Sequence, residues 1–193
     1  MKIILFNGPP HVGKDTAAEI LVQRLGADRI GFADHLKEAT HAAYGMFGLP
    51  WYHFQAVKDM PREEFLGLTP RRAYILHSEN YIKPIHGNDF FGKMFLRRAA
   101  SSQAKIIGVP DSGFKDEATP VVEKYGRENV ALVRLHRKGC SFAGDSRGYI
   151  DLDIQSFEVE NDKTINDLAA DIKRIADWLL AGGEEWFPED LAA

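Results

Sequence analysis

Two glycines and a lysine near the start of the chain have the spacing of a phosphate-binding loop. Gly8, Gly13 and Lys14 form the pattern G-x-x-x-x-G-K, and Asp15 and Thr16 follow directly. Glycines let the backbone curl so that successive N–H groups point at an anion, and the lysine adds a compact positive charge for the β- and γ-phosphates. The predicted phosphate-binding residues are Gly8, His11, Val12, Gly13, Lys14, Asp15 and Thr16.

An aspartate follows the lysine, where this motif commonly has a Ser or Thr that ligates Mg²⁺. Asp15 could act as a metal ligand through water, or contact a second substrate that accepts the phosphate. It could also be a first-turn acid that favours the helix dipole. These alternatives stay open at the level of sequence, and Thr16 supplies a hydroxyl one position later as a further candidate metal ligand.

A second acidic candidate is Asp111, which follows the predicted strand 105–109. In parallel sheets, sites form at the carboxyl ends of the strands, so Asp111 is expected on the same edge as the phosphate-binding loop. There it could position Mg²⁺ through water or contact the acceptor hydroxyl, and we count it as a candidate catalytic residue. A turn or helix-capping role before Gly113 is the alternative.

Cations that could close over phosphates gather in the stretch 134–147, on a polar, glycine-containing loop. An arginine offers a planar fork that matches phosphate oxygens. We predict that residues 136–150 form a lid, in which Arg137 and Arg147 serve catalysis and Arg137 also contacts the nucleotide. A solvated charge run is the alternative.

The predicted acceptor side carries a second group of charges. Thr69 and Pro70 have the residue types of a helix start, and Arg71 and Arg72 follow. Free N–H groups at such a start also favour an anion, so these arginines could hold a monophosphate. The remaining candidate substrate-binding residues are Asp34 and Lys37, although a surface role for Lys37 is an alternative.

The elements expected to position these residues alternate along the chain. Apolar runs predict strands at 2–6, 29–33, 105–109, 130–135 and 154–159. Helical spacing or capping residues predict helices after Lys14, from 34 to about 47, from Pro70, from about 88 to 99, through 121–122 and from 165 to 179. Continuous apolar strands alternating with helices predict an α/β fold, with a parallel sheet covered by helices on both faces.

Size and composition favour one domain spanning residues 1–193. A single cysteine excludes a disulfide framework, and no apolar stretch approaches the ~20 residues of a membrane span. We therefore expect a cytoplasmic protein without a membrane partner. Residues 69–105 hold seven Lys/Arg and two Asp/Glu, which suits a local anionic ligand better than a broad nucleic-acid surface.

Taken in order, five stretches resemble the phage deoxynucleoside monophosphate kinases, which belong to the adenylate-kinase-like P-loop kinases. These stretches are 8–16, 32–37, 69–71, 111–114 and 134–147. The resemblance implies a P-loop kinase fold with a five-stranded parallel sheet, a helical nucleoside monophosphate (NMP)-binding region at about 33–100 and a lid at about 136–150. It implies transfer of the ATP γ-phosphate to a deoxynucleoside monophosphate (dNMP), giving the diphosphate, with Mg²⁺. It also places Asp34, Lys37 and Arg71 on the acceptor side and Asn161 near the adenine.

Two other functions remain open at this stage. A P-loop kinase could phosphorylate a 5-hydroxymethyl pyrimidine within phage DNA, although the acidic stretch 151–193 opposes a DNA-contacting face. The chain could also be a non-catalytic nucleotide-binding protein. The sequence leaves open which base is accepted and whether the chain forms a homodimer.

Overall fold

Five parallel strands form the centre of the computed structural model, which describes residues 1–183. The strands are β1 (Lys2–Asn7), β2 (Asp28–Arg29), β3 (Ile106–Val109), β4 (Val130–His136) and β5 (Gln155–Glu160). Their order is β2-β3-β1-β4-β5, and every pairing is parallel. This topology confirms the predicted α/β fold. The predicted domain runs to residue 193, and its last ten residues lie outside the described part of the chain.

Seven α-helices are described between and after these strands. They are α1 (Lys14–Leu25), α2 (Asp34–Ala43), α3 (Pro70–His77), α4 (Lys83–His86), α5 (Phe90–Ala99), α6 (Lys115–Tyr125) and α7 (Ile165–Leu180). Single turns of 3₁₀-helix lie at η1 (Trp51–Phe54), η2 (Glu63–Phe65) and η4 (Arg127–Asn129), and a π-helical turn, η3 (Ser78–Ile82), joins α3 to α4.

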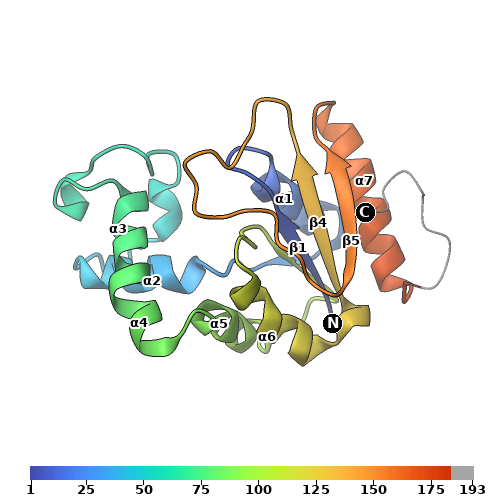
Figure 1. Ribbon diagram of the computed structural model, residues 1–193, viewed down its shortest axis with the longest axis horizontal. Coiled ribbons are helices and arrows are strands. Elements are labelled where there is room, and N and C mark those ends of the chain that lie inside the picture. Colours follow the sequence, from blue (N-terminus) through green and yellow to red (C-terminus); the bar gives the residue numbers. More distant parts are fainter. Residues whose placement is uncertain (184–193) are drawn as a thin grey trace.

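Alternation along β1 shows how the sheet acquires two cores. Ile4 and Phe6 join the cluster formed with α1 and α7, whereas Ile3 and Leu5 join the cluster formed with α5 and α6. Successive strand side chains point to opposite faces, so a strand that is apolar throughout requires helices on both. Figure 1 shows these two pairs of helices around the sheet, with α2, α3 and α4 extending to one side.

Local capping signals place the helix ends as expected at two positions. Gly26 takes the left-handed conformation (φ 62°) after α1, and its N–H donates to the Val22 carbonyl at 3.1 Å. The Thr69 hydroxyl accepts from the Arg72 N–H at 3.1 Å and caps α3, with Pro70 as the first helical residue. The start of α3, which presents Arg71, is therefore fixed by its sequence.

The second strand is shorter than the sequence predicts. Residues 29–33 were expected in the sheet, but β2 ends at Arg29. Beyond it, the N–H groups of Phe32 and Ala33 donate to the Asp111 carboxylate at 2.8 and 3.0 Å, instead of to a neighbouring strand. This side chain therefore replaces the sheet's hydrogen bonds and turns the chain into α2.

The helical region beside the sheet has its own small core. Phe54, Phe65 and Ala73 are buried together, away from the two sheet clusters. The buried ring of His41 packs edge-on against both phenylalanines, and its Nε2 lies 2.9 Å from the Tyr74 hydroxyl. This core joins α2, η1, η2 and α3 into one unit.

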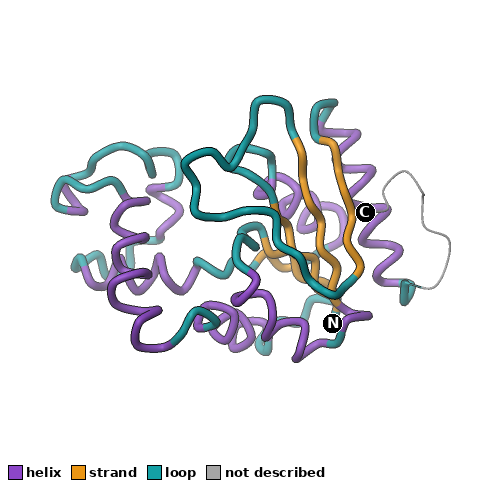
Figure 2. The backbone as a smooth tube through the Cα atoms, viewed as in Figure 1, coloured by secondary structure: helices purple, strands orange, loops and turns teal. Residues whose placement is uncertain are grey.

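The segment 137–154 connects β4 to β5 without helix or strand, as Figure 2 shows. Its far end is anchored, because Ile150 and Leu152 are buried against the sheet and the Ile150 carbonyl accepts from Arg134 at 2.8 Å. The predicted lid at 136–150 thus corresponds to a loop whose last residues are held to the sheet. Within residues 1–183, no helix combines the length and the apolar character needed to cross a membrane.

Candidate active site

Both motif glycines of the loop between β1 and α1 occupy positions that exclude a side chain. Gly8 has φ 149°, and a Cβ there would lie 2.7 Å from the Leu135 carbonyl oxygen. Gly13 has φ 105°, and a Cβ there would lie 2.4 Å from the Asn161 Nδ2. Backbone conformation and close neighbours therefore both require glycine. The loop opens at the carboxyl end of β1, where the sequence placed it.

Lys14 folds back over this loop. Its Nζ donates to the carbonyls of Gly8 and Pro9 at 2.7 and 2.6 Å. Burial and then the positive charge of Arg147 lower the pKa of Lys14 to about 8, against the opposing charges of nearby aspartates. An anion at the loop would raise this pKa again, because an opposite charge favours the protonated form of the amine.

Asn161, which was expected near an adenine, lies against the loop itself. Its Nδ2 donates to the Val12 carbonyl at 2.8 Å, and its backbone N–H donates to the His136 carbonyl at 2.8 Å. The next residue, Asp162, accepts from the Lys138 N–H at 2.8 Å. Asn161 and Asp162 therefore tie the end of β5 to the phosphate-binding loop and to the base of the β4–β5 loop.

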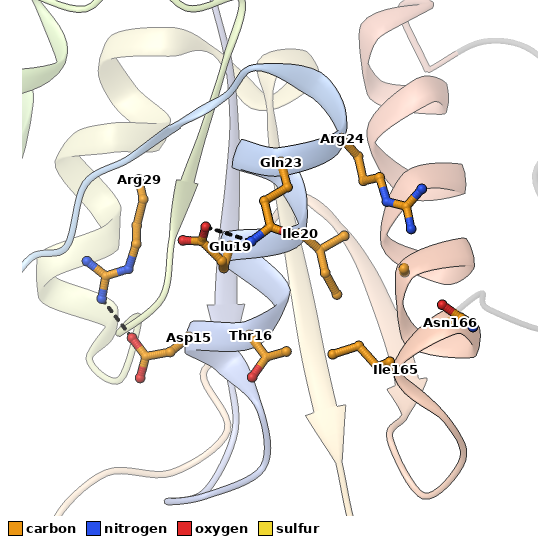
Figure 3. A pocket seen from close by; sticks show the side chains of 10 residues that line it. Asp15, Thr16, Glu19, Ile20, Gln23, Arg24, Arg29, Ile165 and Asn166 are labelled. Atoms are coloured by element: carbon orange, nitrogen blue, oxygen red, sulfur yellow. Dashed lines mark hydrogen bonds and ion pairs between the residues drawn. The ribbon is translucent and has the colours of Figure 1, made fainter. Parts of the chain in front are cut away.

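Asp15 is paired with a cation that the sequence did not suggest. Its Oδ1 accepts from the Arg29 guanidinium at 2.7 Å, as Figure 3 shows. Asp15 and Thr16 also line one end of an open groove of about 500 Å³ between α1 and α7. Since Arg29 ends β2, this pairing turns Asp15 towards the strand that leads into the helical region.

Asp34 and Asp111 converge on Gly31. A Cβ on Gly31 would lie 2.9 Å from the Asp34 Oδ1 and 2.9 Å from the Asp111 Oδ2. Asp34 also accepts from the Gly31 N–H at 2.7 Å through Oδ2, while its buried Oδ1 has no hydrogen-bond partner within residues 1–183. Burial and then the charge of Asp111 raise the pKa of Asp34. Two carboxylates at the end of β3 and the start of α2 therefore provide hard oxygen ligands near the loop.

Lys37 follows Asp34 by one helical turn and partly compensates that buried charge. Its Nζ lies 3.6 Å from the Asp34 Oδ1 and 3.8 Å from the centroid of the Trp51 ring. The ring face attracts the ammonium, so Trp51 holds Lys37 beside Asp34. The helical region thus holds a small charged cluster beside the sheet, formed by Asp34, Lys37 and Trp51.

Arg147 reaches the end of β3 from the β4–β5 loop. Its side chain covers Gly113, where a Cβ would lie 2.4 Å from the Arg147 Cδ. Asp145 accepts from the Arg147 Nε and Nη2 at 2.8 and 2.5 Å. Those hydrogen bonds lower the pKa of Asp145 to about 2, and the charge of Arg71 adds to the effect. Asp145 therefore binds an arginine of the predicted lid and lies within electrostatic range of one of the predicted acceptor side.

Arg71 is held by a carboxylate of the helical region. Its Nε and Nη2 donate to Asp59 at 2.5 and 3.2 Å, and its backbone N–H donates to the Lys58 carbonyl at 3.0 Å. Burial lowers the pKa of Lys58, as do the charges of Arg71 and Lys37, against the opposing charge of Asp15. The half-buried Lys58 therefore lies among the charges of the site.

The other two predicted arginines are not brought into this group. Arg137 and Arg72 are both exposed, and within residues 1–183 neither side chain has a hydrogen-bond or ion-pair partner. The Arg72 backbone N–H instead takes part in the cap of α3. Arg137 stands at the base of the β4–β5 loop, next to the stretch that Asn161 and Asp162 hold.

Asn7 is a structural residue of the site that sequence reasoning passed over as the end of a strand. It is 1% exposed, and its Nδ2 donates to the carbonyls of Ser112 and Gly148 at 2.7 and 3.1 Å. Its Oδ1 accepts from the Ile150 N–H at 3.1 Å. A polar residue at the end of an apolar strand was the available signal, and its amide fixes the β4–β5 loop against the end of β3.

Comparisons with known proteins give one distant relative by sequence and a solved structure of low similarity. No family model matches the chain. It is 26% identical over 186 residues to an Acanthamoeba polyphaga mimivirus protein described as a "Putative deoxynucleotide monophosphate kinase", covering 89% of this chain and 94% of the relative. A solved structure of a sugar kinase from Janibacter sp. HTCC2649 is 14% identical, with a TM-score of 0.49 over 97% of this chain and 99% of that one.

Proposed function

We propose that this chain is a deoxynucleoside monophosphate kinase, which transfers the γ-phosphate of ATP to a dNMP and releases ADP and the deoxynucleoside diphosphate. The observation that carries the proposal is that three cations from three parts of the fold lie within electrostatic range of one group of charged residues. Lys14 comes from the phosphate-binding loop, Arg147 from the β4–β5 loop and Arg71 from the helical region. Both arginines lower the pKa of Asp145. The distant mimivirus relative supports the same assignment.

Such an arrangement suits phosphoryl transfer, which depends on positioning and charge stabilisation. In the proposed reaction, an oxygen of the acceptor monophosphate bonds to the γ-phosphorus while the bond to the β–γ bridging oxygen breaks. Lys14 would stabilise the β- and γ-phosphate oxygens, and Arg147 the charge that develops on the transferred group. Since the acceptor oxygen is already ionised near neutral pH, the step needs no strong general base.

Mg²⁺ would enter this site with the nucleotide. Within residues 1–183, no group of three His, Cys, Asp or Glu side chains is arranged to hold a metal ion. Magnesium usually keeps several waters and binds through one or two carboxylates together with phosphates. A site with few protein carboxylates therefore fits a magnesium ion that arrives with the nucleotide. Asp111, together with Asp15 and Thr16 in the first turn of α1, would hold the hydrated ion, which would neutralise phosphate charge.

The acceptor is proposed to lie between the sheet edge and α2–α3. Arg71 would bind its monophosphate, and the buried Oδ1 of Asp34 would accept a hydrogen bond from a hydroxyl of the acceptor. A buried oxygen without a hydrogen bond is costly, and the Lys37 Nζ at 3.6 Å compensates only part of its charge, so a donor from the substrate would stabilise it. Asn161 and the exposed Arg137, both at the carboxyl ends of β4 and β5, are proposed to approach the adenosine of ATP.

The test is an ADP-release assay with ATP, Mg²⁺ and a panel of acceptors. The panel holds dTMP, dGMP, dCMP, dAMP, their ribose forms, 5-hydroxymethyl-dUMP and DNA containing hydroxymethyluracil. Turnover on free monophosphates that disappears in Lys14→Ala supports the proposal. ATP binding without acceptor-stimulated turnover would refute catalysis, and turnover restricted to the DNA would move the acceptor from a free nucleotide to a base within DNA.

A further inference from the structure

The Arg71 guanidinium is already occupied in the way a phosphate would occupy it. Two of its nitrogens, Nε and Nη2, donate to the two carboxylate oxygens of Asp59 at 2.5 and 3.2 Å. A guanidinium fork binds carboxylates and phosphates with the same bidentate geometry. Asp59 therefore presents to Arg71 the charge and the paired oxygens of an anionic ligand.

Lys58, the residue before Asp59, supplies a second cation at the same place. Its carbonyl accepts from the Arg71 N–H at 3.0 Å, which fixes the 58–59 backbone beside the first turn of α3. Burial and the positive charge of Arg71 lower the pKa of Lys58, against the opposing charges of Asp15 and Asp59. A partly desolvated ammonium close to a guanidinium is unfavourable by itself and becomes favourable when an anion binds between them.

Segment 58–59 and Arg71 lie within electrostatic range of charged groups from both loops of the candidate active site. Hydrogen bonds from Arg71 lower the pKa of Asp59, and the charges of Lys58 and of His11 in the phosphate-binding loop lower it further. Arg71 also contributes to the low pKa of Asp145, whose carboxylate holds Arg147. Segment 58–59 is thus close enough to both the β1–α1 loop and the β4–β5 loop to influence their charged groups.

We propose that Lys58 binds the acceptor monophosphate together with Arg71, and that Asp59 occupies the Arg71 guanidinium until this monophosphate displaces it. This inference rests on the proposed function, because it assigns two further residues to the acceptor half of that site. Asp59 is a positioning residue under this proposal, since it acts through Arg71. The exchange is easily made, because both side chains of the pair are exposed, at 39% and 55%, and exposed ion pairs are weak.

Two substitutions have opposite expected effects on the acceptor. Lys58→Met removes a charged partner of the phosphate, so the KM for the acceptor should rise about tenfold or more. Asp59→Asn keeps the shape but removes the competing charge, so the same KM should fall about two- to fivefold. The KM for ATP should stay within about twofold in both variants, because the phosphate-binding loop is unchanged.

Matched controls lie at the opposite edge of the sheet, just before the amino-terminal ends of two strands. Lys105→Met makes the same change of charge at an exposed residue just before β3. Asp153→Asn breaks another exposed arginine–aspartate pair, with Arg127, just before β5. Neither control should alter either KM. A rise in the acceptor KM of Asp59→Asn would overturn the displacement model, because it would mean that Asp59 assists acceptor binding.

A binding measurement separates this inference from the proposed function. Inorganic phosphate is titrated calorimetrically into the protein saturated with MgADP, for wild type, Lys58→Met and Lys105→Met. Suppose that the wild type phosphorylates no nucleotide, but that wild type and Lys105→Met bind phosphate and Lys58→Met does not. The anion site then stands and the proposed function fails. If wild type is an active kinase and Lys58→Met changes neither phosphate binding nor the acceptor KM, this inference is refuted while the function stands.

Discussion

Replacing Gly113 by alanine should lower kcat strongly while leaving the fold intact. A Cβ at this position would lie 2.4 Å from the Arg147 Cδ and 2.9 Å from its Cγ, whereas carbon atoms in contact are about 3.5–4.0 Å apart. The arginine must therefore move by about 1 Å or more. Its side chain is flexible, so it can yield without displacing the backbone, and the free energy of unfolding should change by less than about 1 kcal/mol.

The expected loss of activity is far larger than that change in stability. Displacing a positioned cation from the developing charge should lower kcat by about 10²–10³-fold, while the KM for ATP changes little. Gly148→Ala is the matched control, because the same methyl group there meets no atom within 4 Å. Steady-state ADP release and urea unfolding of both variants test the argument. A Gly113→Ala enzyme with wild-type kcat would show that catalysis does not depend on the position of Arg147 beside Gly113.

Three further predictions concern other parts of the site. Lys14→Ala should lower kcat by about 10³-fold or more in the ADP-release assay, and wild-type turnover would overturn its assignment to the phosphates. Asn7→Ala leaves one buried carbonyl, one partly buried carbonyl and one buried N–H without this partner, so urea unfolding should show a loss of about 3 kcal/mol; a loss under about 1 kcal/mol would contradict its linking role. Burial raises the pKa of Glu117 in α6 to about 8 from 4.5, so its contribution to stability is present below pH 4.5 and is lost as the pH rises through 8. Glu117→Gln should therefore be more stable than wild type at pH 8.5, by up to about 4 kcal/mol, with a smaller difference at pH 5; parallel pH profiles would contradict this.

The fold could be predicted because its signals are local. The apolar strand 2–6, the two motif glycines and the first turn of α1 are contiguous, and the alternation of strands and helices predicts a parallel sheet, although it does not fix the order of the strands. The cap of α3 at Thr69 is equally local. The end of β2 was predicted wrongly because it depends on Asp111, which is about eighty residues away in the sequence and takes the backbone N–H groups of Phe32 and Ala33.

The ion pairs of the site were harder to predict from the sequence, because they depend on tertiary structure. The sequence proposed Asp15 and Arg71 as candidates but gave no means of finding Arg29 or Asp59, to which they are bound. Lys58 lies in a segment without hydrophobic periodicity, so it carried no signal of its own. Residue types identified possible chemistry, whereas the partner of each charge required the three-dimensional arrangement.

The separate core of the helical region makes it a unit for exchange between proteins. Phe54 and Phe65 bury their rings against His41 instead of the sheet, and Tyr74 contacts both this core and the α5–α6 side of the sheet. A graft that replaces residues 46–68 while keeping His41 and Tyr74 would leave the packing of the sheet unchanged. New acceptor preferences could then be introduced by recombination, without redesign of the phosphate-binding half of the molecule.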